Sequence, residues 1–345
     1  MKTDLERDLR DMMHRTADGL QHTPVATPGL VRRARVRRAG TAILAGVAVL
    51  ALVVGGSAAT RTLQNDEAIP PAGQPSPTPR TEISGPSLLD LQAGDTRPLP
   101  DSILGGSLYY TSPDRTMFVI NSCCSPPNPV SIANVDGTGI RQVTPDGIDG
   151  FGARWSPDGS LLVYQERNGA THEIGNLFVV DVATEETTQI TDLDPASYGR
   201  WALLPSFSAD GQTIIFHMPK GPDGASTRWD LWSVPVAGGE PTLVVRNASM
   251  GVYAPDGQTL AYLDSPRGGW TSSRLMVADV DGSDPRLLVE GDQIDFPQWS
   301  PDGTRIAYSD SDGTHVVDVS TGEASLVTDA GVRDWFGDDT LVVAP

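Results

Sequence analysis

The chain has 345 residues, enough for two average domains or for one large repeat domain beside non-globular segments. Its 36 glycines and 28 prolines indicate many tight turns between short strands. Residues 1–40 hold nine Lys or Arg against five Asp or Glu, whereas the remainder holds sixteen against thirty-nine. This acidic remainder repels nucleic acid and anionic lipid head groups, so we expect no nucleic-acid partner.

Residues 1–40 are predicted to be a cytoplasmic tail. A short amphipathic helix is expected between Asp4 and Leu20. Five arginines follow shortly before the next segment: Arg32, Arg33, Arg35, Arg37 and Arg38. This arrangement resembles the short cytoplasmic leaders of actinobacterial single-pass proteins, some of them related to anti-sigma factors. Two interpretations stay open: a tail that only directs insertion, and a sensor that signals to a partner through the tail.

Residues 41–59 contain no charged residue and predict a transmembrane helix. At about 1.5 Å per residue such a helix spans about 28 Å, close to the thickness of the hydrocarbon core. The preceding arginines place the N-terminus in the cytoplasm. A cleaved signal peptide ending near Ala59 is the alternative, but a forty-residue leader is longer than the usual n-region. We therefore expect a single-pass protein of the cell membrane.

Residues 60–86 predict a spacer. Proline recurs through this stretch with polar residues between, so it cannot build a packed core and is expected to be semi-rigid. The prolines are Pro70, Pro71, Pro75, Pro77, Pro79 and Pro86.

Residues 87–345 contain a repeated unit: an aromatic residue, a Ser-Pro-Asp-Gly turn and an apolar run. Nearly intact copies occupy Trp155–Gly159, Phe207–Gly211, Tyr253–Gly257 and Trp299–Gly303. Degenerate copies occupy Thr111–Arg115 and Trp335–Asp339. The key aspartates are 44, 52, 46, 46 and 36 residues apart. The turn suits a tight reversal, and the apolar run predicts a strand buried on both faces.

A second unit alternates with the first and reads as strand, Gly- or Asp-containing turn, strand. Its copies begin at Ser87, Ser131, Leu177, Leu231, Leu275 and His315. One copy of each unit makes a four-stranded sheet too small to bury both faces alone, and radial packing buries them. The sequence thus predicts an all-β, six-bladed β-propeller over residues 87–345. Its closing blade would join residues 87–100 to residues 335–345.

These W-S-P-D-G-x-x-[IL]-x-[YF] repeats resemble the WD40-like (PD40) repeats of the TolB propeller family over roughly residues 87–345. The resemblance implies an extracytoplasmic six-bladed propeller that acts by binding other proteins. The first and last copies lack the glycine, and the N-terminal domain of TolB itself has no counterpart, so the partners of TolB are not carried over.

The connections opposite the short turns vary in length, and function tends to reside in variable loops on a rigid scaffold. We expect the binding face there, with candidate residues His172, Trp201, His217, Trp229 and Trp270. Covering of blade edges, or simple solvation of the histidines, is the alternative for each. The motif residues Trp155, Trp299 and Trp335 are expected to pack in the core.

Cys123 and Cys124 are the only cysteines. They are either free thiols or a vicinal disulfide, and no spacing matches a zinc site. The run from Asp279 to Asp284 lacks the distal glutamate of a calcium loop and reads as a hairpin turn. No G-x-S-x-G elbow, phosphate-binding loop or dinucleotide fingerprint occurs, so we expect no enzyme and no cofactor.

The predicted function is a membrane-anchored, extracytoplasmic protein-binding module for another protein of the cell envelope. Two alternatives remain beside it. One is a hydrolase or lyase with a metal on the propeller axis, whose ligands would come from different blades. The other is a ligand-sensing propeller that signals through the cytoplasmic tail.

Overall fold

The computed structural model describes residues 83–103, 108–121, 128–167, 174–193, 204–219, 228–264 and 272–345. The predicted tail, the predicted transmembrane helix of residues 41–59 and most of the predicted spacer lie outside these ranges. Over the ranges given, no helix has the length and apolar character needed to cross a membrane.

Three four-stranded antiparallel sheets follow one another in the first part of the ring. The first comprises β3 (Leu108–Thr111), β4 (Met117–Asn121), β5 (Val130–Asn134) and β6 (Arg141–Gln142). The second comprises β7 (Asp149–Trp155), β8 (Leu161–Arg167), β9 (Ile174–Asp181) and β10 (Thr187–Gln189). The third comprises β11 (Ser206–Phe207), β12 (Thr213–Pro219), β13 (Trp229–Pro235) and β14 (Thr242–Val245).

The next sheet has seven strands in chain order. It comprises β15 (Ala248–Tyr253), β16 (Thr259–Asp264), β17 (Ser272–Asp279), β18 (Arg286–Trp299), β19 (Arg305–Asp310), β20 (Gly313–Asp318) and β21 (Ala324–Thr328). The 14-residue strand β18 pairs with β17 through its first part and with β19 from Asp295 onward. Two of the six blades expected as separate sheets are therefore joined, because β18 continues from the outer edge of one unit into the inner edge of the next.

The closing sheet combines both ends of the described chain in the order β2-β1-β23-β22. Its strands are β1 (Ser87–Asp90), β2 (Thr96–Pro98), β22 (Gly331–Gly337) and β23 (Thr340–Ala344). β1 and β23 are antiparallel, with Leu89 opposite Leu341. The predicted junction between the first and last segments is confirmed. A short 3-10 helix, η1 (Asp101–Ile103), connects β2 toward β3.

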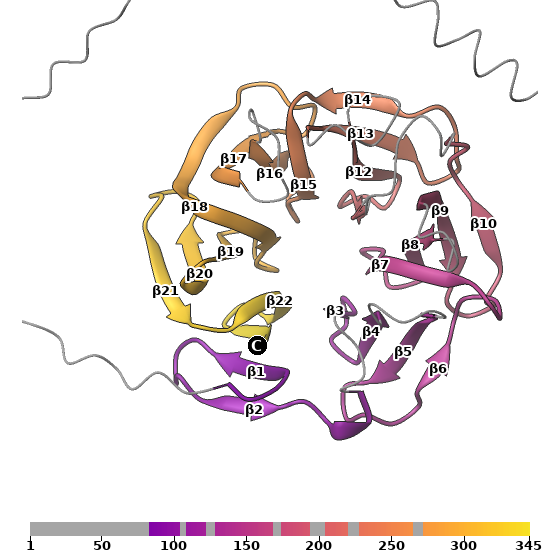
Figure 1. Ribbon diagram of the computed structural model, residues 1–345, viewed down its shortest axis with the longest axis horizontal. Coiled ribbons are helices and arrows are strands. Elements are labelled where there is room, and N and C mark those ends of the chain that lie inside the picture. The colour runs from indigo at the N-terminus through magenta and orange to yellow at the C-terminus, as the bar shows by residue number, and fades with distance from the viewer. Residues whose placement is uncertain are drawn as a thin grey trace, which may run out of the picture. The chain divides into compact units, whose positions relative to one another are not determined.

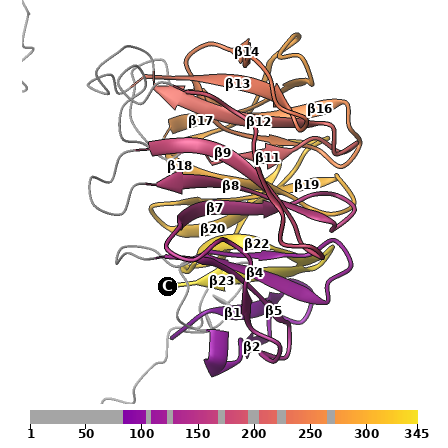
Figure 2. The ribbon, with the colours of Figure 1, turned by 90° about the vertical axis from the view of Figure 1, so that its right-hand side faces the viewer.

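The sheets stand around a central axis like the blades of a propeller (Figure 1). β3, β7, β15 and β22 are drawn nearest the axis, and β2, β6, β10, β14 and β21 on the outside (Figure 1). Seen from the side, the strands run between the two ends of the ring (Figure 2). Because neighbouring strands are antiparallel, the turns of both hairpins in a unit meet at one end, which we call the turn end. The strand ends that lead into the longer connections meet at the other end, the loop end. The protein is an all-β propeller.

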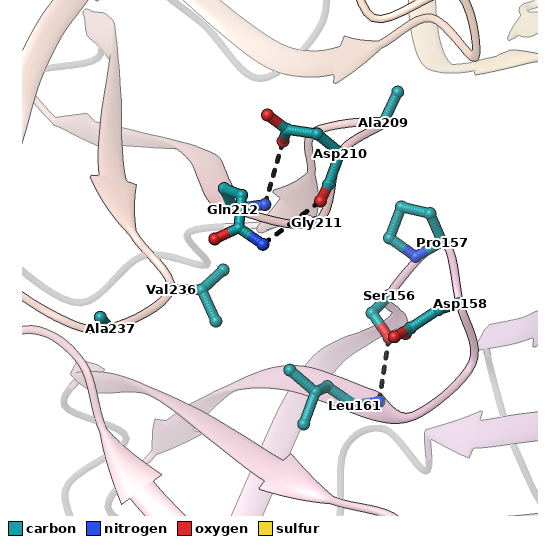
Figure 3. Close-up of a pocket in the computed structure, with 10 residues that line it drawn as sticks. All are labelled: Ser156, Pro157, Asp158, Leu161, Ala209, Asp210, Gly211, Gln212, Val236 and Ala237. Atoms are coloured by element: carbon teal, nitrogen blue, oxygen red, sulfur yellow. Dashed lines mark hydrogen bonds between the residues drawn. The ribbon is translucent and has the colours of Figure 1, made fainter.

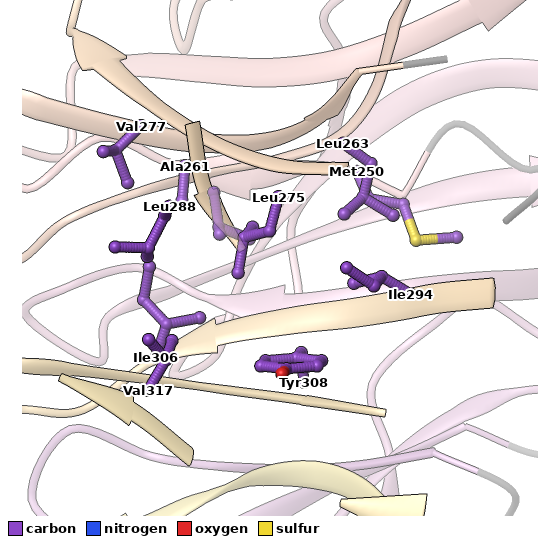
Figure 4. Packing of buried hydrophobic residues seen from close by; sticks show 11 residues of the cluster. Met250, Ala261, Leu263, Leu275, Val277, Leu288, Ile294, Ile306, Tyr308 and Val317 are labelled. Atoms are coloured by element: carbon purple, nitrogen blue, oxygen red, sulfur yellow. The ribbon is translucent and has the colours of Figure 1, made fainter. Parts of the chain in front are cut away.

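The core lies between successive sheets. One cluster joins Val163 and Leu177 of the second sheet to Ile214 and Phe216 of the third. Within the seven-stranded sheet, side chains of β15, β16 and β17 converge on those of β19 and β20 (Figure 4). The cluster comprises Met250, Val252, Ala261, Leu263, Leu275, Val277, Leu288, Ile294, Ile306, Tyr308 and Val317. Each sheet is thus stabilised by burying its apolar face against the next.

The strand after each aspartate turn is buried almost throughout, as in β12, where every residue except Thr213 is buried. β4 and β23 show the same pattern. These strands have a sheet neighbour on either side and packed clusters on both faces, which accounts for their unbroken runs of β-branched and aromatic residues. The expectation from the repeats is confirmed here.

Candidate functional site

A serine and an aspartate organise four of the inner turns. Ser156 Oγ donates a 2.6 Å hydrogen bond to Asp158 Oδ1, and Leu161 N donates back to the hydroxyl at 2.9 Å. The first of these bonds is also the main reason why the pKa of Asp158 lies below its usual value. The serine–aspartate bond recurs in Ser112–Asp114, Ser208–Asp210 and Ser300–Asp302. The repeated aspartates therefore stabilise turns, and their carboxylates are occupied by the fold.

Successive turns also touch one another around the ring. The glycine of each regular turn has a left-handed φ, for example +74° at Gly159, which a side chain would strain. A Cβ at Gly159 would lie 3.7 Å from Cδ of Pro113 in the preceding turn. The same 3.7 Å spacing relates Gly211 to Pro157 and Gly303 to Pro255. The proline of one turn thus packs against the glycine of the next turn, and this contact joins neighbouring units.

The motif tryptophans connect neighbouring inner strands. Trp155 Nε1 donates to the carbonyl of Tyr110 at 3.1 Å, and Trp299 Nε1 donates to the carbonyl of Val252 at 3.2 Å. Trp335 Nε1 donates in the same way to the preceding inner strand, at 3.0 Å. All three indoles therefore pack inside the ring, as the repeats predicted. Each indole hydrogen bond links one unit to the unit before it.

Four inner strands carry a register shift just before the motif aromatic residue. The shifts lie at Phe151/Arg154, Ser249/Val252, Asp295/Gln298 and Val332/Asp334. In three of these strands a residue with a left-handed φ lies two positions before the residue that resumes the pairing: Gly152 (φ 66°), Met250 (φ 50°) and Phe296 (φ 48°). Leu204 (φ 40°) lies two positions before the first residue of β11. An extra residue in a strand re-aims the side chain that follows it. Side chains other than glycine in this conformation are strained, which points to a role for these bulges.

The residue directly before the motif aromatic position, which follows the bulge in these four strands, occupies an equivalent place in all six units. We call this set the axial positions: Tyr110, Arg154, Ser206, Val252, Gln298 and Asp334. Their identities differ completely, in contrast to the motif residues beside them. Sequence variation on a repeated scaffold is where binding specificity is expected.

Four axial positions form one polar cluster. The guanidinium carbon of Arg154 lies 3.3 Å from the centroid of the Tyr110 ring, directly over its face. Arg154 Nη1 donates a 3.0 Å hydrogen bond to Oε1 of Gln298. β7 and β18 lie on opposite sides of the ring, so this bond crosses the axis (Figure 1). The carboxylate of Asp334 accepts a 2.7 Å bond from Thr111 N and interacts electrostatically with Arg154.

Burial dominates the electrostatics of this cluster. It raises the pKa of Asp334 to about 6, although Arg154 lowers it in part. Burial likewise raises the pKa of Asp295 to about 6, against the hydrogen bond from Phe296 N and the charge of Arg333. Carboxylates with raised pKa values are often found at functional positions.

A pocket of about 490 Å³ opens at the turn end between the second and third sheets (Figure 3). Ser156, Pro157 and Asp158 lie on one side of it, and Ala209 and Asp210 on the other (Figure 3). Its size suits a small ligand. However, the polar groups of its walls are already engaged in the turn hydrogen bonds. The pocket therefore offers fewer specific contacts than the axial cluster.

Two of the candidate residues named from the sequence fall within the described ranges, and both are buried. His217 is 1% exposed and Trp229 is 2% exposed, and their rings meet edge to face at 4.9 Å. They lie on the paired strands β12 and β13, and His217 Nδ1 accepts a hydrogen bond from Met250 N. The strands extend further into the expected loop than the sequence suggested, which places both rings in the interior. The described structure therefore gives these two residues a packing role.

The remaining candidates lie outside the described residues. These are His172, Trp201 and Trp270 of the expected binding face, and Cys123 and Cys124 of the cysteine pair. The proposed binding face and the state of the cysteines stay predictions.

The axial cluster was missed at the level of sequence. Nothing in the individual residues marks it, since tyrosine, arginine, glutamine and aspartate have no common motif. Aligning the six units would have revealed it, because polar residues directly before the motif aromatic are unexpected in strands that line a core. Over the described part of the chain, no group of three or more His, Cys, Asp or Glu side chains is placed to hold a metal ion.

Comparison with known proteins agrees with this architecture. The family profile described as "TolB beta propeller domain" (PD40) matches residues 110–321. The Tol-Pal system protein TolB of Methylococcus capsulatus is 40% identical over 77 residues, which cover 21% of this chain and 18% of that protein. TolB of Legionella pneumophila is 39% identical over 75 residues, or 20% of this chain and 18% of its own length. The matches thus span less than a fifth of these relatives.

Among solved structures, a protein designated TolB from Agrobacterium tumefaciens superposes with a TM-score of 0.56 at 16% identity. It aligns with 76% of this chain over 99% of its own length. TolB from Acinetobacter baumannii gives a TM-score of 0.51 at 14% identity, over 76% of this chain and 65% of that one. At these identities the likeness concerns the fold. The profile match covers more than half of the sequence, and the chain belongs to the TolB beta propeller domain (PD40) family.

Proposed function

We propose that this protein is a membrane-anchored, extracytoplasmic propeller that binds another protein of the cell envelope. The observation that carries the proposal is its membership of the TolB propeller family, because the matched relatives are named as components of the Tol-Pal system. The residues of the repeat motif are engaged in turns and in contacts between units, which is consistent with a rigid scaffold that presents a binding surface.

The finer parts of the proposal come from the sequence. Residues 41–59 would cross the membrane, residues 60–86 would hold the propeller away from it, and the loop end would carry the binding face. We count the propeller as six blades, taking the seven-stranded sheet as two units that share β18. The six repeats in the sequence support this count.

The binding face is tested by in-cell photo-crosslinking of the full-length chain. A photoreactive residue is placed at His172, Trp201 or Trp270 of the loop end and, as matched controls, at Thr138 or Thr321 of the turn end. The proposal predicts that the loop-end positions capture one common envelope protein and that the controls do not. Capture from the turn-end positions alone would place the binding face at the opposite end.

The anchor is tested by fractionation of cells that produce the full chain or a variant lacking residues 41–59. The full chain is expected in the membrane fraction after alkaline extraction, and the variant in the soluble fraction. An N-terminus found by protein sequencing just after Ala59 would contradict the anchor and support a cleaved signal peptide.

A further inference from the structure

The axial cluster has the composition of a receptor for an organic cation. Tyr110 offers the negative face of its ring, Gln298 an amide oxygen and Asp334 a carboxylate. These three groups come from β3, β18 and β22, which are consecutive inner strands around the ring. Together they match a guanidinium group, which stacks on aromatic faces and donates in its own plane to oxygen acceptors.

In this structure the guanidinium that occupies the cluster belongs to the same chain. Arg154 extends from β7, stacks on Tyr110 of the neighbouring strand β3 and reaches Gln298 on β18, across the axis (Figure 1). A long arginine side chain can withdraw by rotating about its own bonds, so the cluster can be vacated while the strands stay in place.

The attachment of Arg154 is suited to exchange. Within the described residues, its guanidinium donates one hydrogen bond to a neutral amide and stacks on one ring. Asp334 acts on it through electrostatic interaction, while its carboxylate accepts a hydrogen bond from Thr111 N. A bidentate arginine–carboxylate pair would hold the guanidinium far more tightly.

We propose that Tyr110, Gln298 and Asp334 form a guanidinium receptor on the propeller axis, with Arg154 as its resident occupant, and that an arginine side chain of a protein partner takes its place. The excess of thirty-nine acidic over sixteen basic residues beyond residue 40 attracts a cationic segment toward the propeller. The receptor rests on the ring stack, the amide hydrogen bond and the electrostatic interaction of Asp334 with Arg154, whereas its use by a partner rests on the proposed function.

The receptor is tested by vacating it. The full-length Arg154→Ala variant is titrated with methylguanidinium, and the thermal midpoint is followed by tryptophan emission. Because five heavy atoms occupy the site, we expect saturable binding with a Kd on the order of 1–10 mM. At about 50 mM ligand the midpoint should rise by about 2–5 °C. Wild-type protein, whose receptor is occupied, should show no such rise.

Three controls fix the interpretation. In Arg154→Ala with Asp334→Asn the rise should fall at least about threefold, since the receptor loses its charge. Methylammonium should be weaker than methylguanidinium, because it lacks the planar fork. Acetate should have no saturable effect on wild-type protein. Absence of a saturable rise in Arg154→Ala, or saturable binding of acetate to wild-type protein, would overturn the proposal.

If Arg154→Ala does not fold, Arg154→Lys is used in its place. The shorter ammonium keeps the charge but cannot stack and donate as the guanidinium does, so methylguanidinium should displace it and raise the midpoint. A flat titration of this variant counts against the receptor. These measurements use purified protein and a small probe, so their outcome is independent of whether a partner is captured in cells.

Discussion

The four regular inner turns and the two turns beside the closing sheet hold the same ring together by different contacts. In the regular turns a glycine packs against the proline or alanine of the preceding turn. At the closing sheet Arg115 takes the glycine position, with a φ of 62°, and its guanidinium lies over Gly337 and 3.8 Å from Asp338. Arg305 approaches from the other side, bonding Asp339 at 2.9 Å.

The difference shows what the repeat motif supplies. Apolar contacts between identical turns suffice where one unit follows the next in the chain. Where the ends of the chain meet, the turn has lost its motif, and arginines from both neighbouring units bind its acidic residues. Exposed ion pairs contribute little on their own, so most of the closure energy must come from the buried β1–β23 pairing.

The largest expected effect is the loss of stability when either of two equivalent leucines is replaced. Leu341 of the closing sheet and Leu260 of the seven-stranded sheet are both fully buried, and each follows a threonine at the start of its strand. Replacing either by alanine should lower the free energy of unfolding by about 2–5 kcal/mol. Denaturant unfolding should show one transition in both variants. An additional early transition in Leu341→Ala alone would mean that the closing sheet opens independently.

A smaller effect distinguishes the axial aspartate of the closing sheet from a turn aspartate. The folded pKa of Asp334 is raised from 3.8 to about 6, so its favourable contribution is complete below pH 4 and is lost as the pH rises through 6. The loss is up to about 3 kcal/mol. Asp334→Asn should remove this part of the pH dependence and leave the part that Asp295 contributes through its own raised pKa, as measured by denaturant unfolding at several pH values.

Asp158→Asn is the matched control, and its sign is opposite. The folded pKa of Asp158 lies below its usual value, so its contribution is present above about pH 4 and is lost as the pH falls. Equal pH profiles for the two variants would contradict the distinction between axial and turn aspartates.

Next in size is the serine of the regular turn. Ser156→Ala removes a buried hydroxyl that donates to Asp158 and accepts from Leu161 N, at a cost of about 1 kcal/mol. The protein contains the reverse case, since Ala254 occupies this position in the turn of Asp256. Ala254→Ser should therefore raise the midpoint of thermal unfolding slightly. A loss of stability there would show that this turn has adapted to alanine, for which Thr259 Oγ1 supplies a hydrogen bond to Asp256.

The smallest expected effect on stability is at Arg115, which takes the glycine position in its turn. Arg115→Gly relieves a left-handed side chain, a gain of about 1 kcal/mol, and loses an exposed ion pair with Asp338 of at most about 1 kcal/mol. The net change should be within a few tenths of a kcal/mol of zero. Gly159→Arg, the converse change, should destabilise by about 1–2 kcal/mol, because the equivalent aspartate of the preceding turn, Asp114, is already hydrogen-bonded to Ser112 and Thr116. A marked loss in Arg115→Gly would mean that the ion pair is essential to closure.

Much of the fold could be predicted because its determinants are local. Turn residues and apolar runs recur at regular spacing, and they predict the hairpins and the pairing of the first and last segments. The continuity of β18 could not be predicted in this way. It depends on whether Gly291 to Ile294 extends the strand, and the outcome is set by packing against β17, where Ser272 pairs with Ile294.

The candidate site was harder to predict than the fold. His217 and Trp229 belong to residue types common in binding sites, yet the register of β12 and β13 buries them. Arg154 and Gln298 lie 144 residues apart and meet only because the ring brings β7 and β18 to opposite sides of one axis. The spacing of these two residues along the chain therefore does not indicate that they are in contact.

The pairing of β1 with β23 also means that β1 is synthesised well before the strand with which it pairs. Gln92 and Asp339, which are hydrogen-bonded in the closing sheet, are 247 residues apart, so β1 leaves the ribosome long before its partner strand is made. Throughout that interval it presents an open edge to other nascent chains, a condition that favours misassembly. Slow synthesis of the residues between β1 and β23 would lengthen the time during which this edge is unpaired.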